Sequence, residues 1–457
     1  MSTSADTRTR LTRARAGRPP APVRIVHLGL GNFSRAHLAW YTSHAPDAAA
    51  WGIAAFTGRS RTLADQLGPQ DGLFHLVVRD PAGDRIELVD SLSAVHPAAD
   101  HAAWLRYFAD PAVAIVTSTI TEAGYHSEDG RLAASHPDVA ADLDALRADP
   151  GAPVTTAPAR FVAGLLARRD ADAGAITFCP CDNMPHNGEV VLAVVRDAAR
   201  AVDPSLLAWI DEHVTAVTTM VDRITPRPDP GLAEVVAAAT GLEDAAPVET
   251  EPFSEWVLSG RFAAGHPDWA ASGATFADDI APFEERKLRL LNGAHTLMAY
   301  AGPLVGCETV RDAITHPRVA AWVEDWWREA RRSVPLPASD LDDYVAALRA
   351  RFANPRIRHL LAQIAADGSQ KLPIRILPVL RSERDAGRAG VASCRALAAW
   401  VLHLRGGGVP VQDAGVHSWD DLRGLPLPDA TTDVLARLGV YDPDVARLVA
   451  TLAEEMA

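Results

Sequence analysis

The stretch Val23-Arg-Ile-Val-His-Leu-Gly29-Leu-Gly31-Asn32-Phe33-Ser34-Arg35-Ala-His37 decides the fold, because it predicts a strand, a glycine turn and the start of a helix. In dinucleotide-binding βαβ units the first glycine makes the tight turn, and the second lets the backbone approach a pyrophosphate on the helix N-terminus. Ser34 replaces the third glycine, and a small residue there still permits close packing of helix on strand. We therefore predict that the turn binds a dinucleotide through Gly29, Gly31, Asn32, Phe33 and Ser34.

The expected acidic ligand of the adenosine ribose, about 20 residues further along the chain, is missing. In its place stands Gly58-Arg59-Ser60-Arg61. Either Arg59 or Arg61 can accommodate the 2′-phosphate of NADP, whereas in a bare loop these arginines have no ligand. The sequence thus leaves the cofactor open between NAD and NADP, with Arg59 as a predicted contact.

Short β-branched runs alternate with helical patterns through the first half, which is typical of βαβ units and a mainly parallel sheet. We predict strands at residues 23–28, 52–57, 112–120 and 175–181. Residues 73–95 alternate apolar and polar positions around turn residues, which predicts an inserted hairpin.

From about residue 282 long helical periods replace this pattern. We therefore predict an α/β protein, with a Rossmann-type N-terminal domain over residues 21–280 and an all-helical C-terminal domain over residues 281–457. Residues 1–20 hold five arginines against one acidic residue and predict a disordered tail. In the helical half we expect Trp322, Trp326 and Trp327 to pack in the core.

The composition, with 457 residues of which 48% are hydrophobic and 22% charged, is that of a two-domain globular protein. A net charge of −14 argues against a nucleic-acid partner, because phosphate binding needs clustered cations. No stretch approaches the roughly 18 uninterrupted apolar residues of a membrane span. We expect a cytoplasmic protein, either a monomer or a dimer.

Metal ligands are not evident in the sequence. The four cysteines are too few and too irregularly spaced for a disulfide framework or an all-cysteine zinc site, so we expect reduced thiols. His186 follows Cys179 and Cys181 but has no further ligand at zinc spacing. We therefore predict a reaction that needs no metal.

A second informative stretch is Pro282-Phe-Glu284-Glu-Arg-Lys287-Leu-Arg-Leu-Leu-Asn292-Gly-Ala-His295. At the ~100° per residue of a regular α-helix, Glu284, Asn292 and His295 all fall within about 140° of Lys287. Leucines share this sector, which predicts a partly apolar cleft in which burial lowers the pKa of a lysine toward that of a base. From spacing alone, a surface face of mixed charge is the alternative.

Seven ordered motifs resemble the mannitol dehydrogenase family of polyol-specific long-chain dehydrogenases. They are G-x-G-x-F-x-R-A-H at 29–37, W-G-I at 51–53, T-E-A-G-Y at 121–125, C-D-N at 181–183, M-V-D-R-I-T-P at 220–226, E-P-F-x-x-W-V at 251–257 and K-x4-N-x2-H at 287–295. The resemblance covers nearly the whole chain from about residue 23. It implies a Rossmann domain, a helical domain and metal-independent hydride transfer between NAD(P) and a secondary alcohol of a sugar acid or sugar alcohol.

The resemblance also implies catalytic roles. Lys287 would take the proton of the substrate hydroxyl, and Asn183 and Asn292 would donate hydrogen bonds to the developing oxyanion. His295 would orient the substrate oxygen.

Three further residues are implied around the substrate. Asp222 would lie beside the substrate hydroxyls, and Glu284 would carry the proton from the lysine to water. The stretch Asp367-Gly-Ser-Gln-Lys371-Leu-Pro373 is similar to fructuronate reductases, in which Lys371 would pair with the substrate carboxylate. Contact with any polyol, or capping of a helix, is the alternative for Lys371.

D-Mannonate and D-fructuronate are therefore the first substrate prediction. Mannitol 2-dehydrogenase, or another polyol dehydrogenase, is the alternative. A sensor that binds a dinucleotide without turnover is a different class of function. The presence of Lys287, Asn292, His295 and Asn183 argues against it, because degenerate sensors lose catalytic side chains.

Overall fold

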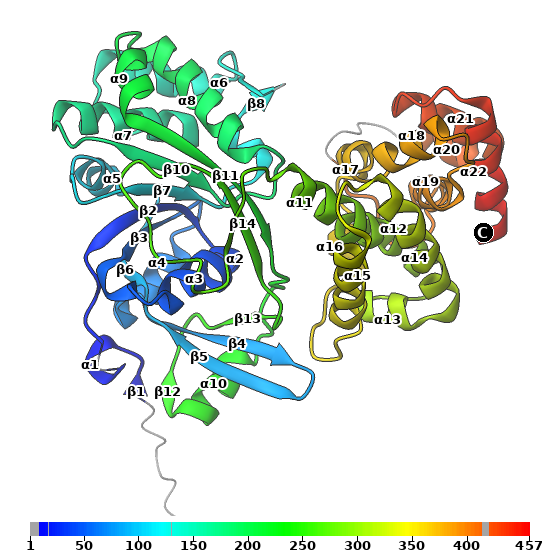
Figure 1. The fold of residues 1–457 in the computed structure, drawn as a ribbon, viewed down its shortest axis with the longest axis horizontal. Helices are drawn as coiled ribbons and strands as arrows, with labels where there is room; N and C mark the ends of the chain where they lie inside the picture. Colours follow the sequence, from blue (N-terminus) through cyan, green and yellow to red (C-terminus); the bar gives the residue numbers. More distant parts are fainter. Residues whose placement is uncertain (1–8, 17, 129, 414–419) are drawn as a thin grey trace, which may run out of the picture. The chain divides into compact units, whose positions relative to one another are not determined.

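The computed structural model describes residues 9–16, 18–128, 130–413 and 420–457. The chain divides into two compact units, Met1–Ile280 and Ala281–Ala457. Figure 1 labels the elements of both units, which are described separately below.

The first unit is built on an eight-stranded sheet of order β15-β14-β11-β10-β7-β2-β3-β6. Its strands are β2 (Val23–Leu30), β3 (Gly52–Thr57), β6 (Leu92–His96), β7 (Ile115–Ser118), β10 (Ile176–Pro180), β11 (Val214–Asp222), β14 (Glu255–Gly260) and β15 (Thr275–Phe276). From β6 to β11 all neighbours are parallel, and β14 runs antiparallel to β11. The order β6-β3-β2-β7-β10-β11 is that of a Rossmann fold, and its direction reverses between β2 and β7. The predicted fold class of this half is confirmed.

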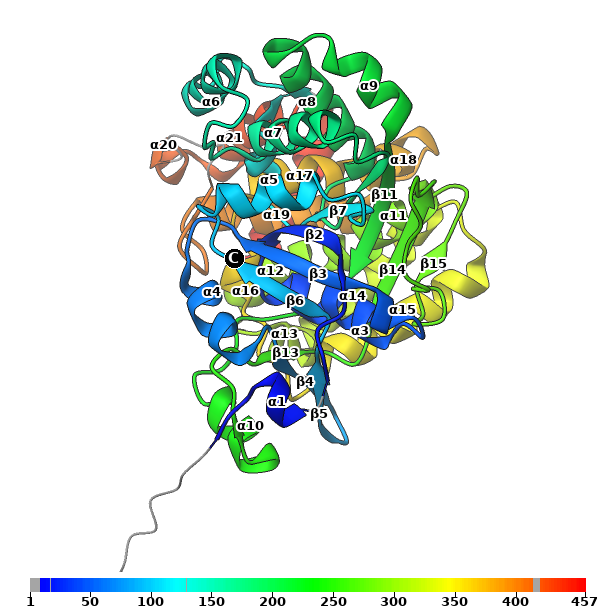
Figure 2. The same ribbon diagram turned by 90° about the vertical axis from the view of Figure 1, so that its left-hand side faces the viewer.

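Buried side chains alternate between the two faces of the sheet. Val26, Ala54 and Phe56 belong to one apolar cluster, whereas Ile25 and Ile53 belong to another. The first cluster includes α5 (His101–Phe108), α7 (Ala157–Asp170) and α8 (Asn187–Val202), which lie together in Figure 2. The second includes residues of the helix after β2 and of α4 (Thr62–Leu67). Because both faces are covered, the parallel strands are apolar on both sides.

The predicted hairpin is present but shorter than the sequence pattern suggested. Strands β4 (Phe74–Asp80) and β5 (Gly83–Val89) pair antiparallel, and β13 (Val248–Thr250) adds to β4 in a separate sheet. Residues 92–96, which continue the same alternation, instead form β6 of the main sheet.

The remaining helices of the first unit are mostly short. They are α1 (Arg13–Ala16), α2 (Asn32–Ser34), the π-helical segment η1 (Arg35–Ala39), α3 (Trp40–His44), α6 (Pro137–Ala148), α9 (Leu206–His213) and α10 (Leu232–Thr240). The helix after the glycine turn thus contains a π-helical segment between two α-helical ones.

The prediction of a disordered tail over residues 1–20 is wrong for its described part. Strand β1 (Thr9–Arg10) pairs with β12 (Leu242–Glu243), and Leu11 is completely buried. The Arg13 guanidinium donates to the carbonyls of Asp90 (2.7 Å) and Leu92 (2.8 Å). Charge composition could not reveal this order, because it depends on carbonyl groups more than 70 positions away.

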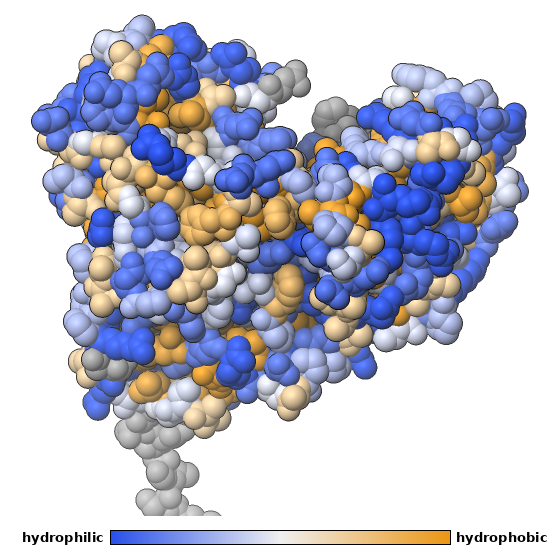
Figure 3. Space-filling model, viewed as in Figure 1, coloured by the Kyte–Doolittle hydropathy of each residue, from blue (hydrophilic) through white to orange (hydrophobic). Residues whose placement is uncertain are grey.

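Among the described residues of the second unit the regular secondary structure is helical, as predicted, apart from one isolated β-bridge between Thr309 and Leu360. Its helices are α11 (Ala281–Arg286), the π-helical segment η5 (Lys287–Asn292), α12 (Gly293–Leu304), α13 (Val310–Thr315), α14 (Pro317–Ala330), α15 (Ala338–Phe352), α16 (Leu361–Ile364), α17 (Gly368–Arg375), α18 (Leu377–Asp385), α19 (Val391–Leu404), α20 (Asp420–Gly424), α21 (Leu427–Arg437) and α22 (Pro443–Met456). Helices α12 and α19 are buried over most of their length. On the face shown in Figure 3 the outer helices of this unit present mostly hydrophilic side chains.

Two of the three tryptophans predicted in the core are completely buried, namely Trp326 and Trp327. Trp322 is partly exposed and lies beside the guanidinium of Arg318. Within the described residues, no helix combines the length and the hydropathy that a membrane span requires.

We predict that Arg13→Ala destabilises the first unit by about 1–3 kcal/mol, because the part-buried carbonyls of Asp90 and Leu92 lose a charged donor. Urea unfolding measures this change. Arg15→Ala is the matched control, since Arg15 is exposed on the same short helix. Equal stabilities of the two variants would contradict the prediction.

Candidate active site

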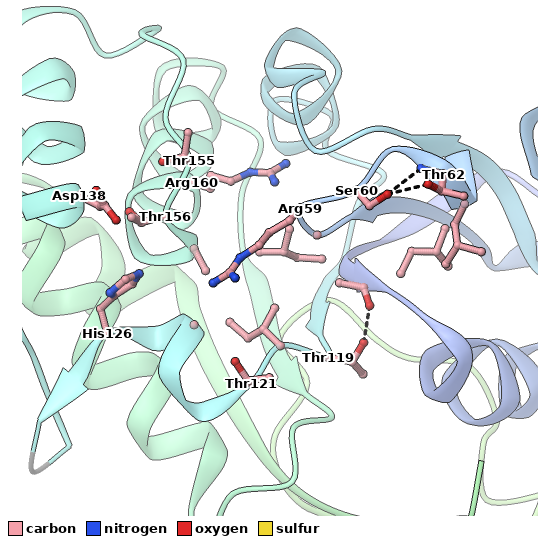
Figure 4. Close-up of a pocket in the computed structure, with 18 residues that line it drawn as sticks. Arg59, Ser60, Thr62, Thr119, Thr121, His126, Asp138, Thr155, Thr156 and Arg160 are labelled. Carbon is pink, nitrogen blue, oxygen red and sulfur yellow. Dashed lines mark hydrogen bonds between the residues drawn. The ribbon is translucent and has the colours of Figure 1, made fainter. Parts of the chain in front are cut away.

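The carboxyl ends of β2 and β7, where the strand order reverses, border a cavity of about 710 Å³ (Figure 4). Its walls come from the end of β2, the turn after β3, the loop after β7 and the start of α7. Ligands of open α/β sheets bind at such a reversal of strand order. The cavity is therefore the candidate dinucleotide site.

Gly29 makes the turn that leads into this site. Its φ of +102° belongs to the region that favours glycine, and a Cβ atom would overlap the carbonyl of Thr119. At Gly31 a Cβ would meet nothing closer than the Gly29 oxygen at 3.7 Å, so a ligand can approach this backbone. Ser34 accepts a hydrogen bond from the Gly31 N–H (2.9 Å), so the serine in place of the third glycine caps the turn.

The predicted cofactor residues divide into two groups. Gly29 and Arg59 line the cavity. Gly31, Asn32, Phe33 and Ser34 belong to the turn and the helix start beside it, and contact of these residues with a cofactor stays a prediction.

The two arginines after β3 have different surroundings. Arg59 points into the cavity, toward His126 (Figure 4). Arg61 forms an exposed ion pair with Asp65 (2.9 Å) and is not part of the cavity wall. Of the two candidates for a phosphate contact, the geometry supports Arg59.

Arg35 fixes the glycine turn from behind, a role that the sequence analysis missed. Only 1% of this residue is exposed, and its guanidinium donates to the Gly31 carbonyl (3.1 Å), the Asn32 side chain (2.7 Å) and the Ala246 carbonyl. Burial lowers the pKa of Arg35 to about 10, so it remains charged at neutral pH. Its place in the motif at residues 29–37 was the available signal.

A buried carboxylate joins the loop after β7 to the end of β10. Asp182 accepts hydrogen bonds from the Ser118 hydroxyl (2.7 Å), the Ile120 N–H (2.6 Å) and the Tyr125 hydroxyl. Burial, and then the charge of Asp182, raises the pKa of Tyr125 well above its usual value. The neighbouring residue, Asn183, is exposed and follows this anchored position.

The predicted catalytic residues come from both units. Asn183 follows β10, and the buried Asp222 ends β11 in the first unit. Glu284, Lys287, Asn292, His295 and Lys371 belong to the second unit. Their joint action in one site stays a prediction.

The segment that carries Lys287 is not a regular α-helix. Residues Lys287–Asn292 form the π-helical segment η5 between α11 and α12. The angular positions calculated for a regular helix are therefore wrong across this segment, because a π turn is wider. Such π segments inside α-helices occur frequently at functional sites.

Two buried indoles hold this π segment. The Trp326 Nε1–H donates to the carbonyl of Arg289 (2.9 Å), and the Trp327 Nε1–H donates to the carbonyl of Leu290 (3.0 Å). A Cβ atom on Gly293 would overlap the Trp326 ring, so glycine permits this close approach. Helix α14 thus supplies donors to carbonyls of the segment between Lys287 and Asn292.

His295 is buried among cationic groups. Burial, and then the charges of His359, Arg351, Arg375 and Lys287, lowers the pKa of His295 well below its usual value. The imidazole is therefore neutral at neutral pH. Its Nε2 atom has no hydrogen-bond partner within the described part of the chain.

Asn292 is also buried, and its Oδ1 atom has no hydrogen-bond partner among the described residues. Buried polar atoms are nearly always hydrogen-bonded in proteins. Asn292 Oδ1 and His295 Nε2 are thus two buried polar atoms that a bound ligand could pair with.

Lys371 donates hydrogen bonds to the carbonyls of Ile364 (3.1 Å) and Ala366. It thereby caps the end of α16, which is one of the alternatives that the sequence left open. Pairing of Lys371 with a carboxylate stays a prediction. Glu284 is buried in the last turns before η5.

Within the described residues no three or more His, Cys, Asp or Glu side chains are placed to hold a metal ion. All four cysteines are free and buried.

Both units match models of one known protein family. The model of the mannitol dehydrogenase Rossmann domain matches residues 23–271, and that of the mannitol dehydrogenase C-terminal domain matches residues 279–456. The chain belongs to the mannitol dehydrogenase family. It is thus an oxidoreductase of the dehydrogenase class, and the resemblance seen in the motifs is confirmed.

Individual members of the family show similarity over most of the chain. D-Mannonate oxidoreductase of Escherichia coli (strain K12) is 38% identical over 84% of this chain and 80% of its own length. Mannitol 2-dehydrogenase of Cereibacter sphaeroides is 35% identical over 86% and 82%, respectively. The solved ternary complex of Pseudomonas fluorescens mannitol 2-dehydrogenase with NAD and D-mannitol has a TM-score of 0.83 at 30% identity, covering 98% of this chain and 94% of that one.

We predict that Trp326→Phe and Trp327→Phe each destabilise the second unit by about 1–3 kcal/mol, because each removes an indole hydrogen bond to a carbonyl of the π segment. Trp322→Phe is the matched control on the same helix, since Trp322 is partly exposed. Thermal unfolding of the three variants measures the difference. Equal losses in all three would show that the indole hydrogen bonds do not stabilise the π segment.

Proposed function

We propose that this protein is an NAD(P)-dependent dehydrogenase that interconverts D-mannonate and D-fructuronate. The observation that carries the substrate class is the cationic surrounding of His295, to which Arg351, Arg375 and Lys287 contribute. A sugar acid brings a carboxylate that such a group can pair with, and arginine is well suited to bind it with two hydrogen bonds. Mannitol, which lacks a carboxylate, is the second candidate.

Similarity to a D-mannonate oxidoreductase supports this order. The slightly lower similarity to a mannitol 2-dehydrogenase, 35% against 38% identity, keeps the alternative open. Helix capping by Lys371 weakens its role as the carboxylate ligand and favours Arg351 and Arg375 for it.

The cavity of the first unit fits a dinucleotide. The Gly29 turn lies at its edge, the backbone at Gly31 is open to a ligand, and the volume is sufficient for the adenosine part. When bound, the nicotinamide supplies the acceptor for the hydride of the alcohol carbon.

The protein's own residues would handle the proton and the oxygen. Lys287 in its neutral form accepts the hydroxyl proton, and Glu284 passes it on to water. Neutral His295 and the amides of Asn292 and Asn183 bind the substrate oxygen. Asp222 contacts a neighbouring hydroxyl.

The basic residues of the chain support the role of Lys287. Of the 44 lysines and arginines, only Lys287 and Lys371 are lysines. An arginine does not lose its proton in a protein, whereas a lysine can. A chain that uses arginine almost everywhere else keeps lysine at the position where the mechanism needs a neutral amine.

We expect kcat/KM for oxidation of D-mannonate to exceed that for D-mannitol, D-arabinitol and D-sorbitol, measured as reduced cofactor at 340 nm. Arg375→Met should raise KM for D-mannonate more than for D-mannitol, because only D-mannonate carries the charge. A parent enzyme that prefers D-mannitol would overturn the assignment of a sugar acid.

We also expect Lys287→Ala and Lys287→Arg each to reduce kcat by ~10²- to 10⁴-fold, the usual size of general-base catalysis. Added methylamine should restore part of the activity of Lys287→Ala, which leaves space for it, but not that of Lys287→Arg. Dinucleotide binding, measured by calorimetry, serves as the control and should not change.

The pH dependence separates Lys287 from His295. Alcohol oxidation should rise with pH as the lysine loses its proton, and ketone reduction should fall. His295 does not contribute at neutral pH, because burial holds its pKa well below its usual value. Activity of Lys287→Arg within tenfold of the parent, with the same pH profile, would assign the proton transfer to another residue.

A further inference from the structure

The wall of the cavity that α7 forms contains two buried side chains with unsatisfied polar atoms. Arg160 is 3% exposed and Thr156 is 6% exposed. The Nε and Nη2 atoms of Arg160 and the Oγ1 atom of Thr156 have no hydrogen-bond partner within the described residues. Both residues line the cavity (Figure 4). Because buried polar atoms are nearly always paired, two such groups in one wall point to a ligand.

Aromatic rings fix the guanidinium of Arg160. It lies 4.6 Å from the centre of the Trp104 ring and 5.6 Å from that of Phe56, and both rings are completely buried. Stacking on a ring satisfies the face of a guanidinium but leaves the N–H groups at its edge available. Burial lowers the pKa of Arg160 to about 10, which leaves it charged at neutral pH.

Phe56 places this cation relative to the fold. It is the last residue but one of β3, and the turn with Gly58, Arg59 and Ser60 follows it directly. Arg160 extends from α7 toward this turn (Figure 4). In NAD-binding Rossmann domains an acidic residue at this turn binds the adenosine ribose. In this protein Arg59 lies on that turn, and Arg160 of α7 lines the same cavity.

The charges of the cavity favour an anion. Arg59 and Arg160 are permanent cations in its wall, and Asp138 alone is acidic among the described residues that line it. The N-terminus of α7 does not add to this preference, because Asp142 accepts the N–H groups of Thr155 (3.0 Å) and Thr156 (2.7 Å). The attraction for an anion therefore rests on the side chains.

We propose that Arg160 and Thr156, together with Arg59, form a subsite for the 2′-phosphate of NADP, and that the protein binds NADP in preference to NAD. This inference rests on the proposed dinucleotide site and names the form of the cofactor that it takes. The guanidinium edge and the hydroxyl, both unpaired, supply donors to a phosphate that NAD does not carry.

Calorimetric titration with adenosine 2′,5′-bisphosphate and with AMP tests the subsite without turnover, because the two probes differ only in the 2′-phosphate. We expect the parent to bind the bisphosphate at least tenfold more tightly. Arg160→Met should reduce this ratio to threefold or less while AMP binding stays the same, and Thr156→Val should reduce it about two- to fivefold.

Arg61→Met is the matched control, since Arg61 belongs to the same turn but pairs with Asp65 outside the cavity. It should leave the ratio unchanged. If Arg160→Met does not fold, the parent's ratio and Thr156→Val decide the question. Equal binding of both probes by the parent, or an equal loss of both in Arg160→Met, overturns the subsite. Failure of the parent to bind either probe overturns the dinucleotide site itself.

Discussion

No side chain fits at residue 29, because the carbonyl of Thr119 occupies the space in which a Cβ would lie. This contact joins the ends of β2 and β7, the two strands between which the sheet changes direction. The loops on either side diverge from this point and leave the cavity between them. Arg35, behind the turn, and Asp182, under the loop after β7, fix the two sides by hydrogen bonds within the protein. These hydrogen bonds form without a ligand, and such preorganisation reduces the entropic cost of binding.

In the second unit, several polar side chains lie on one largely buried helical stretch, η5 and α12. A regular helix would distribute Lys287, Asn292 and His295 at fixed angles. The π segment changes these angles, and the indoles of Trp326 and Trp327 bind carbonyls within it. Asn292, which ends the segment, and His295, which follows it in α12, carry the unpaired atoms. The local distortion and these buried, unpaired polar atoms thus occur together, as is frequent at functional sites.

The sequence predicted those features that depend on local patterns. The glycine turn, the alternation of strands and helices, and the change to helices near residue 280 all follow from spacing within a few residues. The π segment could not be predicted, because its indole donors lie 37 positions away. Arg160 and Thr156 also escaped notice, since an arginine in a helix is ordinarily a surface residue. For Lys371 the sequence allowed both a ligand contact and a helix cap, and the structure shows the cap.

The ordered start of the chain has a practical consequence for making the protein. On composition alone, one would express the chain from about residue 20, where the arginine-rich stretch ends. That deletion would remove Leu11 from its buried position and Arg13 from the carbonyls of Asp90 and Leu92. An affinity tag joined ahead of residue 9 retains these contacts. The strand that begins at Thr9 is therefore the natural limit for trimming this end.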